Sequence, residues 1–173
     1  MRTGFTSAAR NKHPTVAASL AYTAQGGAQT AGAALVSNVA PAVFAANQNG
    51  TGAAVAQFFR VTPHNKVTVT DTFAGSSGAY VTSPYTLGPS TDKVYLILYA
   101  TGIRRHSLNP VQSTVGGAKV PVLYAGTVAG FAGLDQINIG PLPSTLAGTG
   151  KGDIAVQLTV DAITANAVTV NIQ

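Results

Sequence analysis

The chain of 173 residues contains no cysteine, no tryptophan and no glutamate. The absence of cysteine excludes a disulfide-stapled scaffold, thiolate catalysis and thiolate zinc sites. Charged residues make up 9% of the chain, against about 25% in a typical globular protein. A sequence so poor in charge is not typical of a disordered chain or of a long, salt-bridged helical protein. Because glutamate is missing while Val, Thr, Gly and Pro are retained, the composition favours short strands and many turns.

The few charges are unevenly distributed. The net charge is +5, and three bases (Arg2, Arg10 and Lys12) fall within residues 1–36, where no acid occurs. Nucleic-acid binders cluster their Lys and Arg residues, so we predict no nucleic-acid partner. No run of about 18 apolar residues is present, so we predict no membrane span. The apolar stretch from Val16 to Ala21 is shorter than a secretory signal needs. Residues 1–35 show no steady hydrophobic period and contain Gly26 and Gly27, so we expect them to form an irregular N-terminal arm or linker.

From residue 36 onward the hydrophobic pattern is that of strands. Residues 153–160 and 167–172 alternate apolar and polar positions, and residues 55–62 and 66–73 form a hairpin pattern around Pro63. Residues 94–99 are an unbroken apolar run, typical of a central strand covered on both faces. Gly116 and Gly117 separate two further strands. The chain is thus predicted to be all-β, with residues 36–173 forming an immunoglobulin-like antiparallel β-sandwich.

Several linked motifs in the predicted sandwich carry a family resemblance. They are VAPAVFAAN at 39–47, NGTG at 49–52, LGPSTD at 87–92, VYLILY at 94–99, TGIR at 101–104, VGG at 115–117, VLYAG at 122–126, FAGLDQIN at 131–138 and LPSTLAG at 142–148. In order and content they resemble an uncharacterised C-terminal module of secreted acidobacterial (Solibacter-type) proteins, similar to the immunoglobulin-like IPT/TIG domains. The resemblance implies an extracellular or cell-surface location. It implies no catalytic residue, cofactor or ligand.

The residues that most often carry chemistry are dispersed. His13, His64 and His106 lack metal-binding spacing, and Ser107 beside His106 lies in no nucleophile motif. A calcium site built on Asp92 or Asp135 is an alternative, but Asp135 is better explained as a loop cap. We predict no catalytic, cofactor-binding or metal residue, and no enzyme activity.

Three further segments have simple structural explanations. The densest basic spot, formed by Arg104, Arg105 and His106, could bind an anionic polymer, but a solvated loop is favoured. The glycine-rich segment 148–152 contains Lys151 but lacks the phosphate-loop spacing, which favours a turn between strands. Asn49 and Thr51 form an N-glycosylation sequon, meaningful only where the modifying machinery exists.

Two functions fit this pattern. The leading hypothesis is a non-enzymatic extracellular module for structure or cell adhesion, in which residues 15–23 or 28–36 add a strand to another subunit and build a homo-oligomer or filament. The alternative is a module that binds carbohydrate, such as a surface glycan, through loop aromatics: Tyr80, Tyr85 and Phe131. For Phe131 and Tyr124 the favoured expectation is core packing.

Overall fold

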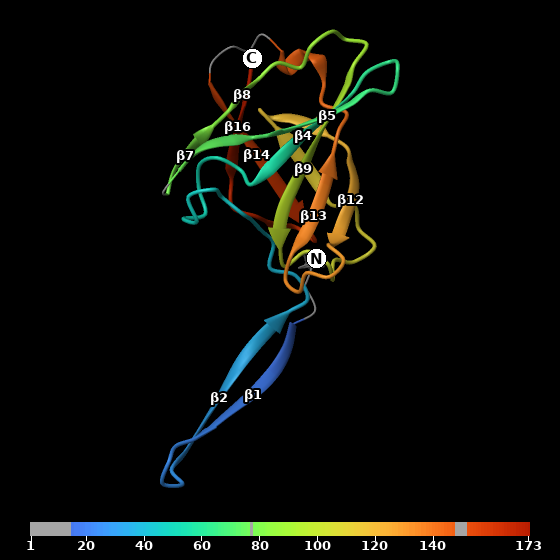
Figure 1. Cartoon of the computed structure of the whole chain (residues 1–173). Coiled ribbons are helices and arrows are strands. Elements are labelled where there is room, and N and C mark those ends of the chain that lie inside the picture. The colour runs from blue at the N-terminus through green and yellow to red at the C-terminus, as the bar shows by residue number, and fades with distance from the viewer. Residues whose placement is uncertain (1–14, 77, 148–151) are drawn as a thin grey trace, which may run out of the picture. The chain divides into compact units, whose positions relative to one another are not determined.

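The computed structural model describes residues 15–76, 78–147 and 152–173, shown in Figure 1. Its contacts divide the chain into two compact units, Met1–Asn38 and Val39–Gln173. The second unit contains the sandwich and the hydrophobic core. None of the described residues forms a helix with the length and hydropathy needed to cross a membrane.

The first unit is a β-hairpin in its described part. Strands β1 (Thr15–Thr23) and β2 (Gln29–Ser37) pair antiparallel along their whole length. Gly26 and Gly27, both at positive φ, form the turn between them. The expectation of an irregular arm in residues 1–35 is therefore wrong for residues 15–35, which form most of this hairpin. The pairing places the large apolar residues of β1, Val16, Leu20 and Tyr22, on one face. The small alanines between them make this alternation hard to recognise in the sequence.

The second unit is built from two main sheets and one small hairpin. The first sheet has the order β11-β10-β14-β16-β8, with β15 beside β14, and the second has the order β12-β13-β9-β4-β5, with β3 beside β9. We call them the β14 sheet and the β9 sheet. Strands β6 and β7 form the small hairpin. The bounds are β3 (Ala42–Val43), β4 (Ala56–Val61), β5 (Val67–Asp71), β6 (Phe73–Ser76), β7 (Ala79–Thr82), β8 (Pro84–Tyr85), β9 (Lys93–Thr101), β10 (Gln112–Val115), β11 (Ala118–Val120), β12 (Val122–Thr127), β13 (Asp135–Ile139), a 3-10 turn η1 (Ser144–Leu146), β14 (Asp153–Val160), β15 (Ile163–Thr164) and β16 (Val168–Ile172).

The two main sheets face each other and enclose one core, and in Figure 1 the β9 sheet lies in front of the β14 sheet. Alternate residues of β9, β14 and β16 are buried between the sheets, among them Leu96, Leu98, Leu158, Val170 and Ile172. Each such side chain contributes about 1.5–3 kcal/mol through removal from water. The prediction of an all-β, antiparallel β-sandwich is confirmed, and β8 adds a short parallel pairing to β16.

One detail of the central strand differs from the sequence expectation. Strand β9 alternates buried and half-buried residues, so it is covered on one face rather than both. Its outer face carries Tyr95, Ile97 and Tyr99, and the cross-strand partner of Tyr95 is Phe59 on β4. Because large apolar and aromatic residues also occupy the outer face, where they lie beside those of neighbouring strands, the run is continuously apolar in sequence.

Candidate functional site

The aspartate weighed as a calcium ligand serves the fold. Asp135 is completely buried at the start of β13. Its carboxylate accepts hydrogen bonds from the backbone N–H of Ile103 (2.8 Å) and of Arg104 (3.2 Å) and from the guanidinium Nε of Arg104 (2.8 Å). Because both oxygens face N–H donors and one faces a cation, the group is not arranged to hold a calcium ion. This agrees with the expected capping role, here closing the β9–β10 connection.

Asp92, the other aspartate considered as a calcium ligand, also has a structural partner. Its carboxylate lies 4.0 Å from Nη1 of Arg60, and its side chain is nearly buried. Arg60 also lies over the ring of Tyr85, 5.2 Å from its centroid, and donates through Nε to the tyrosine hydroxyl at 3.1 Å. The guanidinium is thus shared between a ring, a hydroxyl and a carboxylate, which leaves Asp92 as a charge partner rather than a metal ligand.

The remaining acids join neighbouring segments. Asp71 accepts from the Gln57 amide at 3.0 Å, and Asp161 accepts from the Ser107 backbone N–H at 2.8 Å. Asp153 accepts from the hydroxyl of Thr82. The hydroxyl of Ser107 donates to Asp161 and not to His106, so the pair is not an activated nucleophile. Within the described residues, no three His, Asp or Glu side chains gather as a metal site would require.

The basic spot is weaker than its sequence suggests. Arg104 is committed to Asp135 and to the carbonyl oxygen of Leu134, at 2.9 Å. The Nδ1 atom of His106 lies 2.6 Å from the Ser107 carbonyl oxygen. Both arginines are exposed, but the guanidinium of Arg104 is held by its bonds to Asp135 and Leu134, which makes Arg105 the cation of the group better placed to meet an anion. His13, Lys12 and the segment 148–151 lie outside the described residues.

The three aromatics considered for carbohydrate stacking are not equivalent. Tyr85 is buried and stacks on Phe58, with ring centroids 4.0 Å apart, so it belongs to the core. Tyr80 packs edge-on against Phe73 at 5.5 Å. Phe131 is 62% exposed, and Tyr124 is also exposed, so the expectation that both fill the core is wrong. Strand β12 is an edge strand, and Phe131 lies in the loop that joins it to β13.

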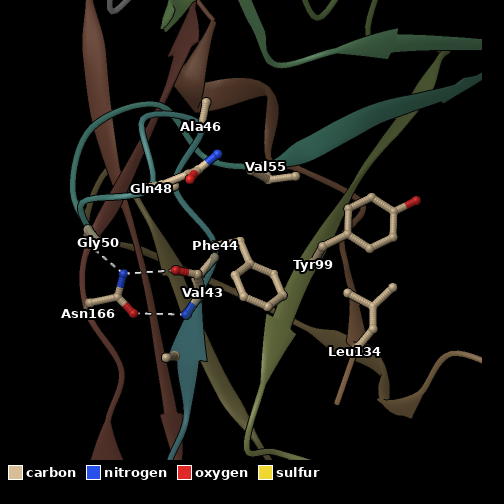
Figure 2. A pocket seen from close by; sticks show the side chains of 11 residues that line it. Val43, Phe44, Ala46, Gln48, Gly50, Val55, Tyr99, Leu134 and Asn166 are labelled. Carbon is tan, nitrogen blue, oxygen red and sulfur yellow. Dashed lines mark hydrogen bonds between the residues drawn. The ribbon is translucent and has the colours of Figure 1, made fainter. Parts of the chain in front are cut away.

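An apolar hollow of about 890 Å³ lies beside β3, between that strand and the outer face of β9. Figure 2 shows Phe44, Val55, Tyr99 and Leu134 around it, with Asn166 at one side. The hollow contains no charged side chain among its lining residues. Sequence reasoning missed it, because Phe44 and Leu134 lie far apart in the chain. Its chemistry suits an apolar group rather than a reacting substrate.

Asn166 supplies the polar structure next to this hollow. Its side-chain oxygen accepts from the Val43 backbone N–H at 2.8 Å, and its amide nitrogen donates to the carbonyl oxygens of Val43 (2.9 Å) and Gly50 (2.8 Å). The amide thus makes the two bonds to Val43 that a neighbouring strand would make. It closes the free side of β3 at Val43, so the amide of Asn166 is occupied within the fold, and Gln48 is the other polar amide that lines the hollow.

Asn47 closes another strand in the same way. Its amide nitrogen donates to the Tyr80 carbonyl oxygen and its side-chain oxygen accepts from the Tyr80 N–H, each at 2.8 Å. Strand β7 is therefore covered at Tyr80 by a side chain that imitates backbone. An asparagine amide thus bonds to the backbone N–H and C=O of one residue in each of two strands, β3 and β7.

The N-terminal hairpin has no comparable protection in the part that the structure describes. Each of its strands has one partner, so each has one unpaired edge of backbone groups. The face formed by Val16, Leu20, Tyr22 and Val36, here called the hairpin apolar face, is exposed, with Leu20 at 61% and Tyr22 at 70%. No charged residue lies between Lys12 and Arg60 to discourage association. These open edges are the strongest candidate functional feature of the molecule.

Fold and surfaces together define a β-sandwich preceded by a β-hairpin, in which the described aspartates are committed to structural bonds. No protein-family model matches the chain, and no curated protein or solved structure matches it either. The resemblance to the secreted acidobacterial module stays a prediction from the sequence motifs.

Proposed function

We propose that this chain is a non-enzymatic structural or adhesive module that acts at the cell surface or outside the cell and assembles through its N-terminal hairpin. The observation that carries the proposal is the hairpin itself: paired backbone, two edges with no partner among the described residues, and an exposed apolar face. An isolated two-stranded hairpin is marginally stable in water. Pairing with a further strand would satisfy its open edge and cover its apolar residues.

The chemistry of the hairpin favours a protein partner. It offers no cation to phosphate groups, which dominate nucleic-acid affinity. Burial in lipid would leave its edge N–H and C=O groups without partners, at a cost of several kcal/mol for each group. A sheet edge of another protein supplies both the hydrogen bonds and the apolar surface. The extracellular assignment rests on the motif resemblance alone.

The test compares two full-length variants that add the same charge to the same residue type. Ser19→Lys places a lysine in the middle of β1, whereas Ser90→Lys places it in the exposed segment before β9. Because edge lysines oppose strand addition, we expect Ser19→Lys to weaken self-association about tenfold or more, and Ser90→Lys to leave it unchanged. Sedimentation velocity between about 10 μM and about 1 mM measures the difference. A wild-type chain that stays monomeric throughout this range contradicts the proposal.

Carbohydrate binding is the second candidate, supported by the exposed ring of Phe131. Sugar stacking needs an exposed aromatic face, and Tyr85 cannot supply one because it is buried under Arg60. Saturable, salt-insensitive binding on a glycan array that Phe131→Ala abolishes would favour this function. A blank array together with concentration-dependent assembly would favour the first.

A further inference from the structure

The outward-facing backbone groups of the hairpin can be identified from its register. Ala24 N–H donates to the Ala28 carbonyl oxygen at 2.9 Å, directly after the last pair, Thr23 with Gln29. Hydrogen-bonded pairs alternate along an antiparallel ladder, so Val16, Ala18, Leu20 and Tyr22 bond to β2. The backbone groups of Ala17, Ser19 and Ala21 therefore face away from β2. Their side chains are small, which lets another strand approach closely.

Most edges of the two main sheets carry a feature that blocks strand addition. Edge strand β11 contains Lys119 and is followed by Pro121, and β8 begins with Pro84, which has no N–H. Edge strand β12 has a register shift at Leu123, and the Tyr124 hydroxyl donates to its Thr127 carbonyl oxygen at 2.7 Å. The remaining outer strand is β5, with five exposed residues and no proline, lysine or bulge within it. Its one charged residue, Asp71, is at its end and accepts from the Gln57 amide.

The same register argument identifies the free row on β5. Thr62 N–H donates to the Lys66 carbonyl oxygen at 3.0 Å and Thr72 N–H to the Ala56 carbonyl oxygen at 3.1 Å, one at each end of the β4–β5 ladder. The intervening bonded residues of β5 are then Thr68 and Thr70, by alternation. The backbone groups of Val67 and Val69 face outward, and the Val69 side chain is 50% exposed.

The outward-facing N–H and C=O groups of β1 can pair with those of β5, and one chain carries both strands. We infer that β1 of one copy adds antiparallel to the β5 edge of a second copy, an inference that rests on the proposed function. In this pairing Ala17, Ser19 and Ala21 lie on the outer face beside Val67 and Val69. Leu20 and Tyr22 then lie on the same face as Thr70, whose partner Phe58 belongs to the core. The hairpin apolar face would therefore continue the core-facing side of the β9 sheet.

Cross-linking locates the contact, since the chain has no cysteine of its own. Val69→Cys is mixed with one of five full-length partners: Ala17→Cys, Ser19→Cys, Ala21→Cys, Ala18→Cys or Leu20→Cys. Bonded antiparallel neighbours lie about 5.5 Å apart at Cα, within disulfide reach. We expect heterodimers under mild oxidation with at least one of the first three partners and with neither Ala18→Cys nor Leu20→Cys. Leu123→Cys, on the β12 edge, replaces Val69→Cys as the control and should give none.

A proline variant provides an independent measurement. Val69→Pro removes an N–H that faces away from β4, so the fold is retained. The added strand, however, loses one hydrogen bond and clashes with the proline ring. We expect association to weaken about tenfold or more, while the circular dichroism spectrum stays that of the wild type. If Ser19→Lys weakens assembly but Val69→Pro does not, or if cross-links form at Leu123→Cys only, the β5 acceptor is wrong and the hairpin function stands. If neither variant has an effect on assembly, both are wrong.

Discussion

Single side chains complete the backbone of this protein in several places. Asn166 and Asn47 each bond to both the N–H and the C=O of one residue in another strand. The Asp135 carboxylate accepts from two successive backbone N–H groups after β9, those of Ile103 and Arg104. A buried backbone group without a partner costs about 1–3 kcal/mol. These polar side chains are thus occupied by bonds within the fold itself.

The Asp135 contact yields the largest expected stability change. Asp135→Ala leaves the Ile103 and Arg104 N–H groups without acceptors and Arg104 without its counter-charge. We expect a loss of about 3 kcal/mol in the free energy of unfolding, measured by urea denaturation. The matched control is Asp71→Ala, which removes an exposed bond to Gln57 and should cost less than about 1 kcal/mol. Equal losses for the two variants would contradict the structural role of Asp135.

Asn166 offers a second test at this scale. Asn166→Ala removes the partners of Val43 and Gly50 at the hollow, so we expect about 2 kcal/mol less stability in urea. Asn109→Ala, in an exposed loop, is the control and should change stability by less than about 0.5 kcal/mol. A variant at residue 166 as stable as this control would show that water replaces the amide there.

At the scale of elements, the sandwich strands could be predicted. The sequence predicts that residues 15–23 or 28–36 form a strand only by addition to another subunit, and it does not predict their pairing with each other in one hairpin. Strands β14 and β16 alternate Val, Leu and Ile with polar residues, and that period survives in the structure. In residues 15–37 the alternating positions are filled largely by Ala, Ser and Gly, which differ little in hydrophobicity, so no period is visible. The hydrogen bonds of the asparagine amides could not be predicted either, because Asn166 and Val43 are 123 residues apart in the chain.

Strand β5 provides a test of the register that the proposed contact requires. Thr68→Pro removes an N–H bonded to β4, whereas Val69→Pro removes one that faces outward. We therefore expect Thr68→Pro to destabilise the fold by about 2 kcal/mol more than Val69→Pro does, in the same urea experiment. The reverse order would mean that the free row belongs to Thr68 and Thr70.

At the scale of the whole molecule, the proposed contact joins two different surfaces of one chain, so the assembly it would build grows head to tail. A contact between two different surfaces of identical copies gives a ring if the rotation closes and an open filament if it does not. No member of such an assembly has a unique role, apart from the two ends of a filament. This architecture needs no second protein and no nucleotide or metal.

Such an assembly should be nearly independent of ionic strength. The hairpin supplies no charge to the contact, and salt screens only charged interactions. We expect the association constant to change less than about threefold between about 0.05 M and about 0.5 M NaCl, by sedimentation velocity. A steep decrease with salt would point to the exposed Arg105 and an anionic partner instead.

The attachment of the hairpin to the sandwich has a mechanical consequence. Directly after Ser37 and Asn38 the chain enters the core at Val39, and Ala40 N–H donates to the Gly102 carbonyl oxygen at 3.0 Å. Gly102 cannot gain a Cβ, because that atom would overlap the Ala40 carbonyl oxygen. Tension applied by a neighbouring copy to the hairpin must first be borne by this junction and by the bonds of Val43 to Asn166. Under load, the bonds of Ala40 to Gly102 and of Val43 to Asn166 would therefore break before those within the β14 sheet.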